Sequence, residues 1–233
     1  MAEHEPIVAL DVPSAREAAA AVARIGDAIS FYKVGLELFL ADGPETLRML
    51  KGEGKRVFLD LKLHDIPRTV ERAVGSCLRY GADLLTIHSQ GSAAMVEAAA
   101  RAVREAGSDT KILAVTLLTS LDATDLEKLG VARTVEDEVL ALGRLAVGAG
   151  AHGLVCSPKE AAALRAALGP DAILLTPGVR PAGGALGDQK RVATPAEAIR
   201  AGATHLVVGR PILAAPDPRA AALAIRAEMD AAR

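Results

Sequence analysis

Short apolar runs alternate along the whole chain with longer stretches rich in alanine, leucine, arginine and glutamate. Most of the apolar runs are continuous rather than alternating, which is typical of parallel strands covered on both faces. Eight strands with intervening helices in 233 residues predict an α/β fold, a single-domain (β/α)₈ barrel over residues 1–233. The expected strands are residues 7–11, 31–34, 56–62, 84–88, 112–117, 153–156, 173–176 and 206–209.

Capping and turn residues mark where the helices between these runs begin and end. Ser14 and Glu17 have the spacing of a capping box. Pro67, Pro158 and Pro195 lie where a helix is expected to begin. Glycine is the usual left-handed cap just past a helix end, and three predicted strands follow Gly-Ala pairs, at 81–82, 150–151 and 202–203.

An open doubly wound sheet is the alternative fold. No G-x-G-x-x-G follows the first apolar run, where a dinucleotide-binding sheet would need it. One turn-rich stretch, residues 179–191, interrupts the pattern and contains three glycines. Such a loop is either a mobile lid or a surface excursion.

Composition and charge exclude several classes of protein. Hydrophobic residues make up 51% of the chain, which excludes intrinsic disorder. The net charge of −2 gives no basic field for nucleic acid, and 2% aromatic residues offer no platform for stacking bases. Cys77 and Cys156 are too few for a disulfide framework. The chain has no apolar run long enough for a membrane span and no secretory signal, so we expect a cytoplasmic protein.

Ionisable residues gather at the carboxyl ends of the predicted strands, where barrels of this kind carry their active sites. Asp11 ends the first strand, Lys33 lies in the second and His88 ends the fourth. Asp60 and Lys62 are two positions apart in the third, so a regular strand points both the same way. The leucines between and beside them, at 59, 61 and 63, are then expected to face the helices.

A structural ion pair is the alternative interpretation of Asp60 and Lys62. Buried ion pairs stabilise a fold poorly, because desolvation of both charges nearly cancels their attraction. The cluster at the barrel mouth therefore favours a catalytic function. For a single strand-end histidine such as His88 we expect a hydrogen-bonded spacer rather than a catalyst.

Two arginines follow the last two predicted strands, in the corner where these barrels usually bind phosphate. Arg180 follows the seventh strand, and Gly209 with Arg210 follows the eighth. Glycine lets the backbone approach an anion, and the guanidinium group binds phosphate through two parallel donors. The chain shows no zinc-ligand spacing and no triphosphate-binding loop of the G-x-x-x-x-G-K-[ST] type.

The third strand and its loop carry a resemblance to a known family. The sequence Asp-Leu-Lys-Leu-His-Asp-Ile-Pro, residues 60–67, resembles the D-x-K-x-x-D-I-P signature of the orotidine 5′-phosphate decarboxylases. Further family-like segments follow in the family's order across nearly the whole chain, at 8–11, 33–35, 115–120, 176–181, 187–189 and 208–211. The segment 87–91 resembles the family less closely, because Gln90 is larger than the residue expected there.

The resemblance implies a homodimeric barrel that converts orotidine 5′-phosphate to UMP without metal or cofactor. It implies a catalytic array of Lys33, Asp60, Lys62 and Asp65, with Asp65 contributed by the partner subunit and Lys62 as proton donor to C6 of the pyrimidine. It also implies that Asp11 and Lys33 hold the ribose, that Gln189 bridges base and phosphate, and that Arg180, Gly209 and Arg210 hold the phosphate. The other substrate-binding positions implied are Asp60, Thr69, Thr119, Ser120 and Pro177.

Two other functions stay open. One is a magnesium-dependent relative with the same D-x-K-x-x-D pattern, such as 3-keto-L-gulonate 6-phosphate decarboxylase or hexulose-phosphate synthase. Such relatives carry an acidic metal ligand where this chain has Lys33, and a lysine repels a divalent cation. The other is a non-catalytic barrel that binds UMP as a sensor, which the intact set of charged residues disfavours.

Overall fold

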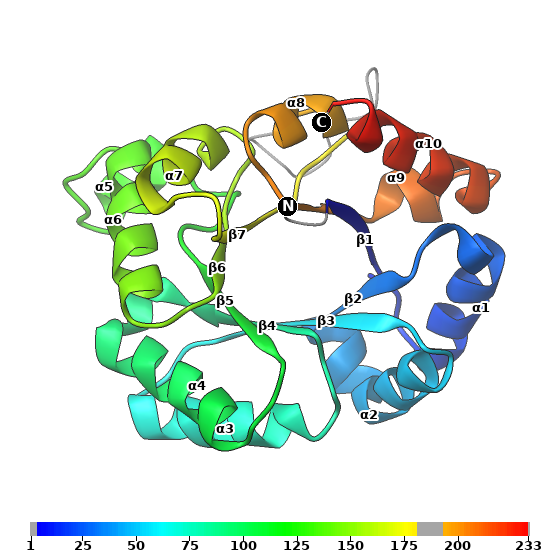
Figure 1. Ribbon diagram of the computed structural model, residues 1–233, viewed down its shortest axis with the longest axis horizontal. Helices are drawn as coiled ribbons and strands as arrows, with labels where there is room; N and C mark the ends of the chain where they lie inside the picture. The colour runs from blue at the N-terminus through cyan, green and yellow to red at the C-terminus, as the bar shows by residue number, and fades with distance from the viewer. Residues whose placement is uncertain (1–3, 181–192, 233) are drawn as a thin grey trace.

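The described residues form a closed barrel of eight parallel strands, in sequence order around the ring (Figure 1). The computed structural model describes residues 4–180 and 193–232. The predicted barrel is confirmed, and its continuous apolar strands are covered on both faces, by helices outside and by side chains inside. The strands are β1 (Glu5–Ala9), β2 (Phe31–Gly35), β3 (Arg56–Leu63), β4 (Leu84–His88), β5 (Lys111–Val115), β6 (Gly153–Val155), β7 (Ile173–Thr176) and β8 (His205–Val208).

Helices surround the strands as an outer layer (Figure 1). Two single turns of 3₁₀ helix, Gly26–Ala28 and Ser89–Gly91, also lie between strands and helices. The α-helices are α1 (Ala15–Ile25), α2 (Leu36–Gly52), α3 (Pro67–Leu78), α4 (Ala93–Glu105), α5 (Ala123–Lys128), α6 (Val135–Gly148), α7 (Ala161–Leu168), α8 (Pro195–Arg200), α9 (Arg210–Leu213) and α10 (Pro218–Asp230).

The capping residues hold most of these helices where the sequence predicts. The Ser14 hydroxyl accepts a hydrogen bond from the Glu17 amide at the start of α1. Gly81, Gly150 and Gly202 all have positive φ, as left-handed caps require. The prediction for Pro158 is wrong: α7 begins three residues later, because the Glu160 carboxylate accepts from the Ser157 amide and closes a turn first.

The predicted strand ends are too late in four places. β1 ends at Ala9 rather than at 11, β5 at Val115 rather than at 117, β6 at Val155 rather than at 156, and β8 at Val208 rather than at 209. In the first three of these the apolar pattern continues past the end of the strand because Leu10, Leu117 and Cys156 are buried in the core between the barrel and the helices. These short extensions carry the chain out of the sheet at the mouth of the barrel, so Asp11 projects from a loop.

His205 lies buried at the opposite end of the barrel, where β8 begins. Its ring meets the edge of Phe31, and its Nδ1 lies 2.9 Å from the Thr204 hydroxyl. Burial, reinforced by the positive charge of Arg56, lowers the pKa of His205 to about 4. The ring is therefore neutral in the folded protein at neutral pH, whereas in the unfolded chain it gains a proton near pH 6.5.

The free energy of unfolding is consequently expected to fall as the pH drops from about 6.5 to about 4, by about 3 kcal/mol from this group alone. Above pH 6.5 neither state is protonated at His205, so this contribution to the pH dependence disappears. Urea titrations of the wild-type protein and of His205→Asn, at pH 7.5 and pH 5, measure it. The asparagine variant should lose clearly less stability on acidification; equal losses in the two proteins would contradict the assignment.

Candidate active site

A cavity of about 600 Å³ opens at the carboxyl ends of the strands, within the usual size range of small-molecule sites. Most of the residues predicted for the site line it. From the first half of the barrel these are Asp11, Lys33, Asp60 and Lys62. From the second half they are Thr119, Ser120, Pro177, Arg180, Gly209 and Arg210.

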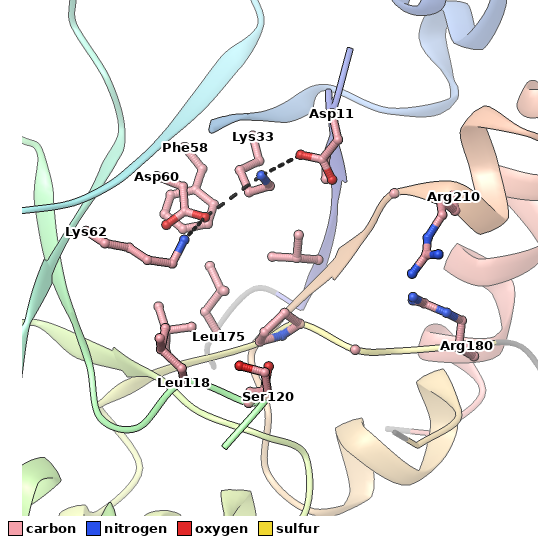
Figure 2. Close-up of a pocket in the computed structure, with 17 residues that line it drawn as sticks. Asp11, Lys33, Phe58, Asp60, Lys62, Leu118, Ser120, Leu175, Arg180 and Arg210 are labelled. Atoms are coloured by element: carbon pink, nitrogen blue, oxygen red, sulfur yellow. Dashed lines mark hydrogen bonds and ion pairs between the residues drawn. The ribbon is translucent and has the colours of Figure 1, made fainter. Parts of the chain in front are cut away.

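Four of these side chains form a chain of alternating charge along one wall of the cavity (Figure 2). The Lys33 ammonium lies 2.9 Å from Asp11 Oδ1 and 3.9 Å from Asp60 Oδ2. Lys62 Nζ donates to the same Asp60 oxygen at 2.7 Å. A single carboxylate oxygen thus faces two ammonium groups.

Burial strengthens the electrostatics at the centre of this chain. The side chains of Lys33 and Asp60 are each 11% exposed, whereas that of Lys62 is 31% exposed and that of Asp11 60%. Charges removed from water interact more strongly and keep their geometry. The structural interpretation of Asp60 and Lys62 as an ordinary ion pair does not account for their place in the cavity wall beside a second lysine.

The third strand is irregular where it carries these charges. Leu59 pairs with Leu85 and Leu63 with Ile87, so the three residues 60–62 of β3 face the single residue 86 of β4. Within this bulge Lys62 has a φ of 50°, in the left-handed region that non-glycine residues rarely adopt. Asp60 and Lys62 both line the cavity, as predicted, but a bulge rather than regular strand geometry brings Lys62 there. The leucines at 59, 61 and 63 do pack toward the helices as predicted.

The two arginines lie across the cavity from the lysines, and Figure 2 shows their guanidinium groups turned toward each other. Arg210 is the first residue of α9, a short helix that the apolar pattern does not predict. Arg180 follows β7, and its amide donates to the Ala193 carbonyl. A Cβ at Gly209 would lie 3.4 Å from both Ala9 Cβ and Asp11 Oδ2, so glycine keeps this corner open.

Apolar side chains complete the cavity; since they carry no ionisable or polar group, they are not among the residues predicted for the site. Phe58 and Leu175 from the barrel interior lie beneath the charged wall, and Leu118, 39% exposed, lies at the rim. Their signal in the sequence is the inward-facing alternation in β3 and β7. The site therefore offers an apolar surface between the lysines and the arginines (Figure 2).

Two of the predicted residues that the structure describes do not line this cavity. Asp65 is exposed, and its carboxylate accepts from the Ile66 amide next to it. Thr69 is exposed on the first turn of α3. Gln189 lies outside the described residues. Asp65 and Thr69 therefore lie outside the cavity formed by their own chain.

His88 differs from the hydrogen-bonded spacer expected at this strand end. Within the described part of the chain its Nδ1 is buried without a hydrogen-bond partner. Its ring packs against that of His64, with 5.2 Å between the centroids. Burial, together with the nearby His64 and Lys62, lowers the pKa of His88, so the ring is neutral at neutral pH.

Two general properties follow from the residues described. In 4–180 and 193–232, no group of three or more histidine, cysteine, aspartate or glutamate side chains is arranged to hold a metal ion. In the same residues, no helix combines the length and the apolar character needed to cross a bilayer.

Comparison with known proteins gives consistent matches over nearly the whole chain. The model of the "Orotidine 5′-phosphate decarboxylase / HUMPS family" matches residues 4–225. A protein named orotidine 5′-phosphate decarboxylase from Anaeromyxobacter sp. (strain K) is 57% identical over 219 residues, covering 94% of this chain and 95% of that protein. One of the same name from Rhodopseudomonas palustris (strain ATCC BAA-98 / CGA009) is 55% identical, covering 97% and 94%.

The fold also matches a solved structure over nearly its whole length. The crystal structure of orotidine 5′-phosphate decarboxylase from Lactobacillus acidophilus superimposes with a TM-score of 0.88 at 35% sequence identity. That alignment covers 98% of this chain and 100% of the other.

Proposed function

The chain belongs to the orotidine 5′-phosphate decarboxylase / HUMPS family, and on this basis we propose that its charged array carries out the decarboxylation, with Lys62 protonating C6 of the pyrimidine. The protein is a carboxy-lyase of pyrimidine biosynthesis that converts orotidine 5′-phosphate to UMP and CO₂. One observation carries the proposed mechanism: the Lys62 ammonium lies in the cavity wall, held 2.7 Å from the buried Asp60 carboxylate.

The reaction requires stabilisation of negative charge on a ring carbon. The bond between C6 and the carboxylate carbon breaks, CO₂ leaves, and the electron pair stays on C6. An ammonium group fixed beside that carbon stabilises the charge as it develops and then donates its proton to C6. Asp60 holds Lys62 in place and also puts a like charge near the departing carboxylate.

The lysines and the arginines lie on opposite sides of the cavity (Figure 2), which supports separate roles for them in catalysis and in phosphate binding. Arg180, Gly209 and Arg210 bind the phosphate, on the side opposite Lys62 (Figure 2). Asp11 and Lys33 bind the ribose hydroxyls, and the pyrimidine lies between Lys62 and the apolar surface near Thr119, Ser120 and Pro177. Binding energy from the remote phosphate then stabilises the assembled site rather than acting at C6.

The exposed loop after β3 supports a homodimer with shared active sites. Asp65 and Thr69 are exposed, and the neighbouring Ile66 is 67% exposed. Leu36 and Leu40, at the start of α2, are 50% and 79% exposed. Large exposed apolar side chains of this kind are suited to an interface between subunits. In such a dimer Asp65 completes the array of the partner subunit.

The chain is further proposed to fold as one domain over residues 1–233 and to act in the cytoplasm. Continuous pairing around the barrel supports the single domain. Cys77 and Cys156 are buried and form no disulfide, which agrees with a reducing compartment.

Lys33 argues against a magnesium-dependent sugar-phosphate relative. Its ammonium is already within 3.9 Å of both Asp11 and Asp60, so the two carboxylates that could hold a cation are paired with a lysine. The purified protein, offered orotidine 5′-phosphate or 3-keto-L-gulonate 6-phosphate in parallel, should turn over only the nucleotide. Turnover of the sugar phosphate would favour the magnesium-dependent function, and tight UMP binding without turnover would favour the sensor.

Replacing Arg210 with alanine is expected to weaken UMP binding about 10- to 100-fold, because the bidentate hydrogen bond from its guanidinium group to the phosphate is lost. Affinity for uridine, which has no phosphate, should stay unchanged. Isothermal titration calorimetry with the two ligands measures both effects. Arg200→Ala is the matched control, since Arg200 is exposed at the end of α8 and lies outside the cavity. An unchanged affinity of Arg210→Ala for UMP would refute the phosphate assignment.

A further inference from the structure

Thr86 lies inside the barrel, directly opposite the bulge that carries the catalytic residues. It belongs to β4, where Leu85 and Ile87 face the helices and Leu84 faces the interior. Thr86, two residues from Leu84, shares the inward direction and is fully buried. It is not among the residues that line the cavity.

The Thr86 hydroxyl makes two hydrogen bonds that join the two parts of the array. Its oxygen accepts from the backbone amide of Lys62 at 2.9 Å. Its proton is donated to Asp60 Oδ1, also at 2.9 Å. One side chain therefore holds both the carboxylate that orients the Lys62 ammonium and the backbone from which Lys62 projects.

The bulge explains why a side chain is needed at this place. Three residues of β3 lie opposite Thr86 alone, so the regular ladder between the two strands is interrupted there. A buried amide left without an acceptor would cost stability. The Thr86 hydroxyl is the acceptor for the Lys62 amide where the ladder is interrupted, and it thereby supports the left-handed backbone of Lys62, which non-glycine residues rarely adopt.

The carboxylate of Asp60 is fixed by the same arrangement. Both lysines approach Oδ2, and Thr86 holds Oδ1. With its two oxygens engaged from different directions, the carboxylate cannot rotate without breaking a hydrogen bond. The Lys62 ammonium, bound to Oδ2, keeps its place relative to the cavity for the same reason.

We propose that Thr86 is a positioning residue for the decarboxylation, acting through Asp60 and the Lys62 backbone and not through contact with the substrate. This inference rests on the proposed role of Lys62. Displacement of a reacting group by about 1 Å can cost about 10²-fold in rate. Loss of the hydroxyl should therefore lower kcat while leaving the binding of UMP nearly unchanged.

The test compares Thr86→Val, which keeps the side-chain shape and removes the hydroxyl, with Thr86→Ser, which keeps the hydroxyl. We expect kcat for orotidine 5′-phosphate to fall about 10- to 100-fold in the valine variant, and to stay within about threefold of wild type in the serine variant. The affinity for UMP should change by less than about threefold in both. Thr86→Cys, which offers only a weak donor, replaces the valine variant if that protein does not fold.

Thr110→Val is the control for a merely structural effect. Thr110 is buried at the far end of the barrel, where its hydroxyl donates to the Ala82 carbonyl. Both valine variants should lose thermal stability, but only Thr86→Val should lose kcat. The inference is overturned if Thr86→Val keeps its kcat, if the serine variant loses as much activity as the valine variant, or if UMP affinity falls in parallel with kcat.

Lys62→Ala, assayed beside these variants, separates the inference from the function on which it rests. An active Lys62→Ala would remove the proposed role of Lys62 itself. An inactive Lys62→Ala with a fully active Thr86→Val would leave that role intact and overturn only the positioning by Thr86.

Discussion

Replacement of Lys62 by alanine is expected to lower kcat for orotidine 5′-phosphate by at least about 10⁴-fold, because one group supplies both the charge that stabilises C6 and the proton that C6 receives. The fold should survive, since Asp60 keeps Lys33 at 3.9 Å and Thr86 on its other oxygen. The fall in ultraviolet absorbance of the substrate, followed at saturating concentration, measures the effect.

A surface lysine provides the control. Lys128 is exposed at the end of α5, outside the cavity, and Lys128→Ala should retain wild-type turnover. Thermal unfolding and UMP binding verify that Lys62→Ala is folded with an intact phosphate site. Turnover of Lys62→Ala within about tenfold of wild type would disprove its role as proton donor.

Replacement of Asp65 by alanine is expected to reduce turnover by at least about 10²-fold, although this residue lies outside the cavity of its own chain. The proposed dimer accounts for the effect by placing Asp65 in the partner's site. A heterodimer with Lys62→Ala in one subunit and Asp65→Ala in the other then contains one intact site. Purified through two different affinity tags, it should show about half of the wild-type activity per dimer.

The matched control carries both substitutions in one subunit and pairs it with a wild-type subunit. In that heterodimer each site lacks either Lys62 or Asp65, so we expect almost no activity although half of the subunits are wild type. If instead this control is half active and the first heterodimer is inactive, Asp65 acts within its own chain and the shared site is wrong.

The barrel itself could be predicted because its main signal is local. Continuous apolar runs separated by capped helices specify parallel strands covered on both faces, and each run became a strand of the barrel. The ends of β1, β5 and β6 were missed because Leu10, Leu117 and Cys156 pack against the helix layer although they lie beyond the last paired residue of their strands. Burial and strand pairing coincide over most of these runs and separate only at their ends.

The candidate site was predictable in its charges and much less in its geometry. Strand ends of a barrel converge, so ionisable residues at several strand ends meet in one cavity without any contact being known in advance. The bulge at residues 60–62 depends on how β3 pairs with β4, and the sequence pattern alone does not contain that register. For the same reason Thr86, an unremarkable threonine in an apolar run, carried no signal before the structure placed it against Asp60 and Lys62.

The central claim is that the charges of this chain perform the decarboxylation, with Lys33 paired to Asp11 and Asp60, the two carboxylates that could otherwise hold a cation. The most direct measurement is the conversion of orotidine 5′-phosphate to UMP by the purified protein in excess EDTA, compared with the same reaction in magnesium. We expect rapid conversion, at the same rate in EDTA and in magnesium. Absence of turnover in EDTA, with turnover restored by magnesium, would contradict the central claim.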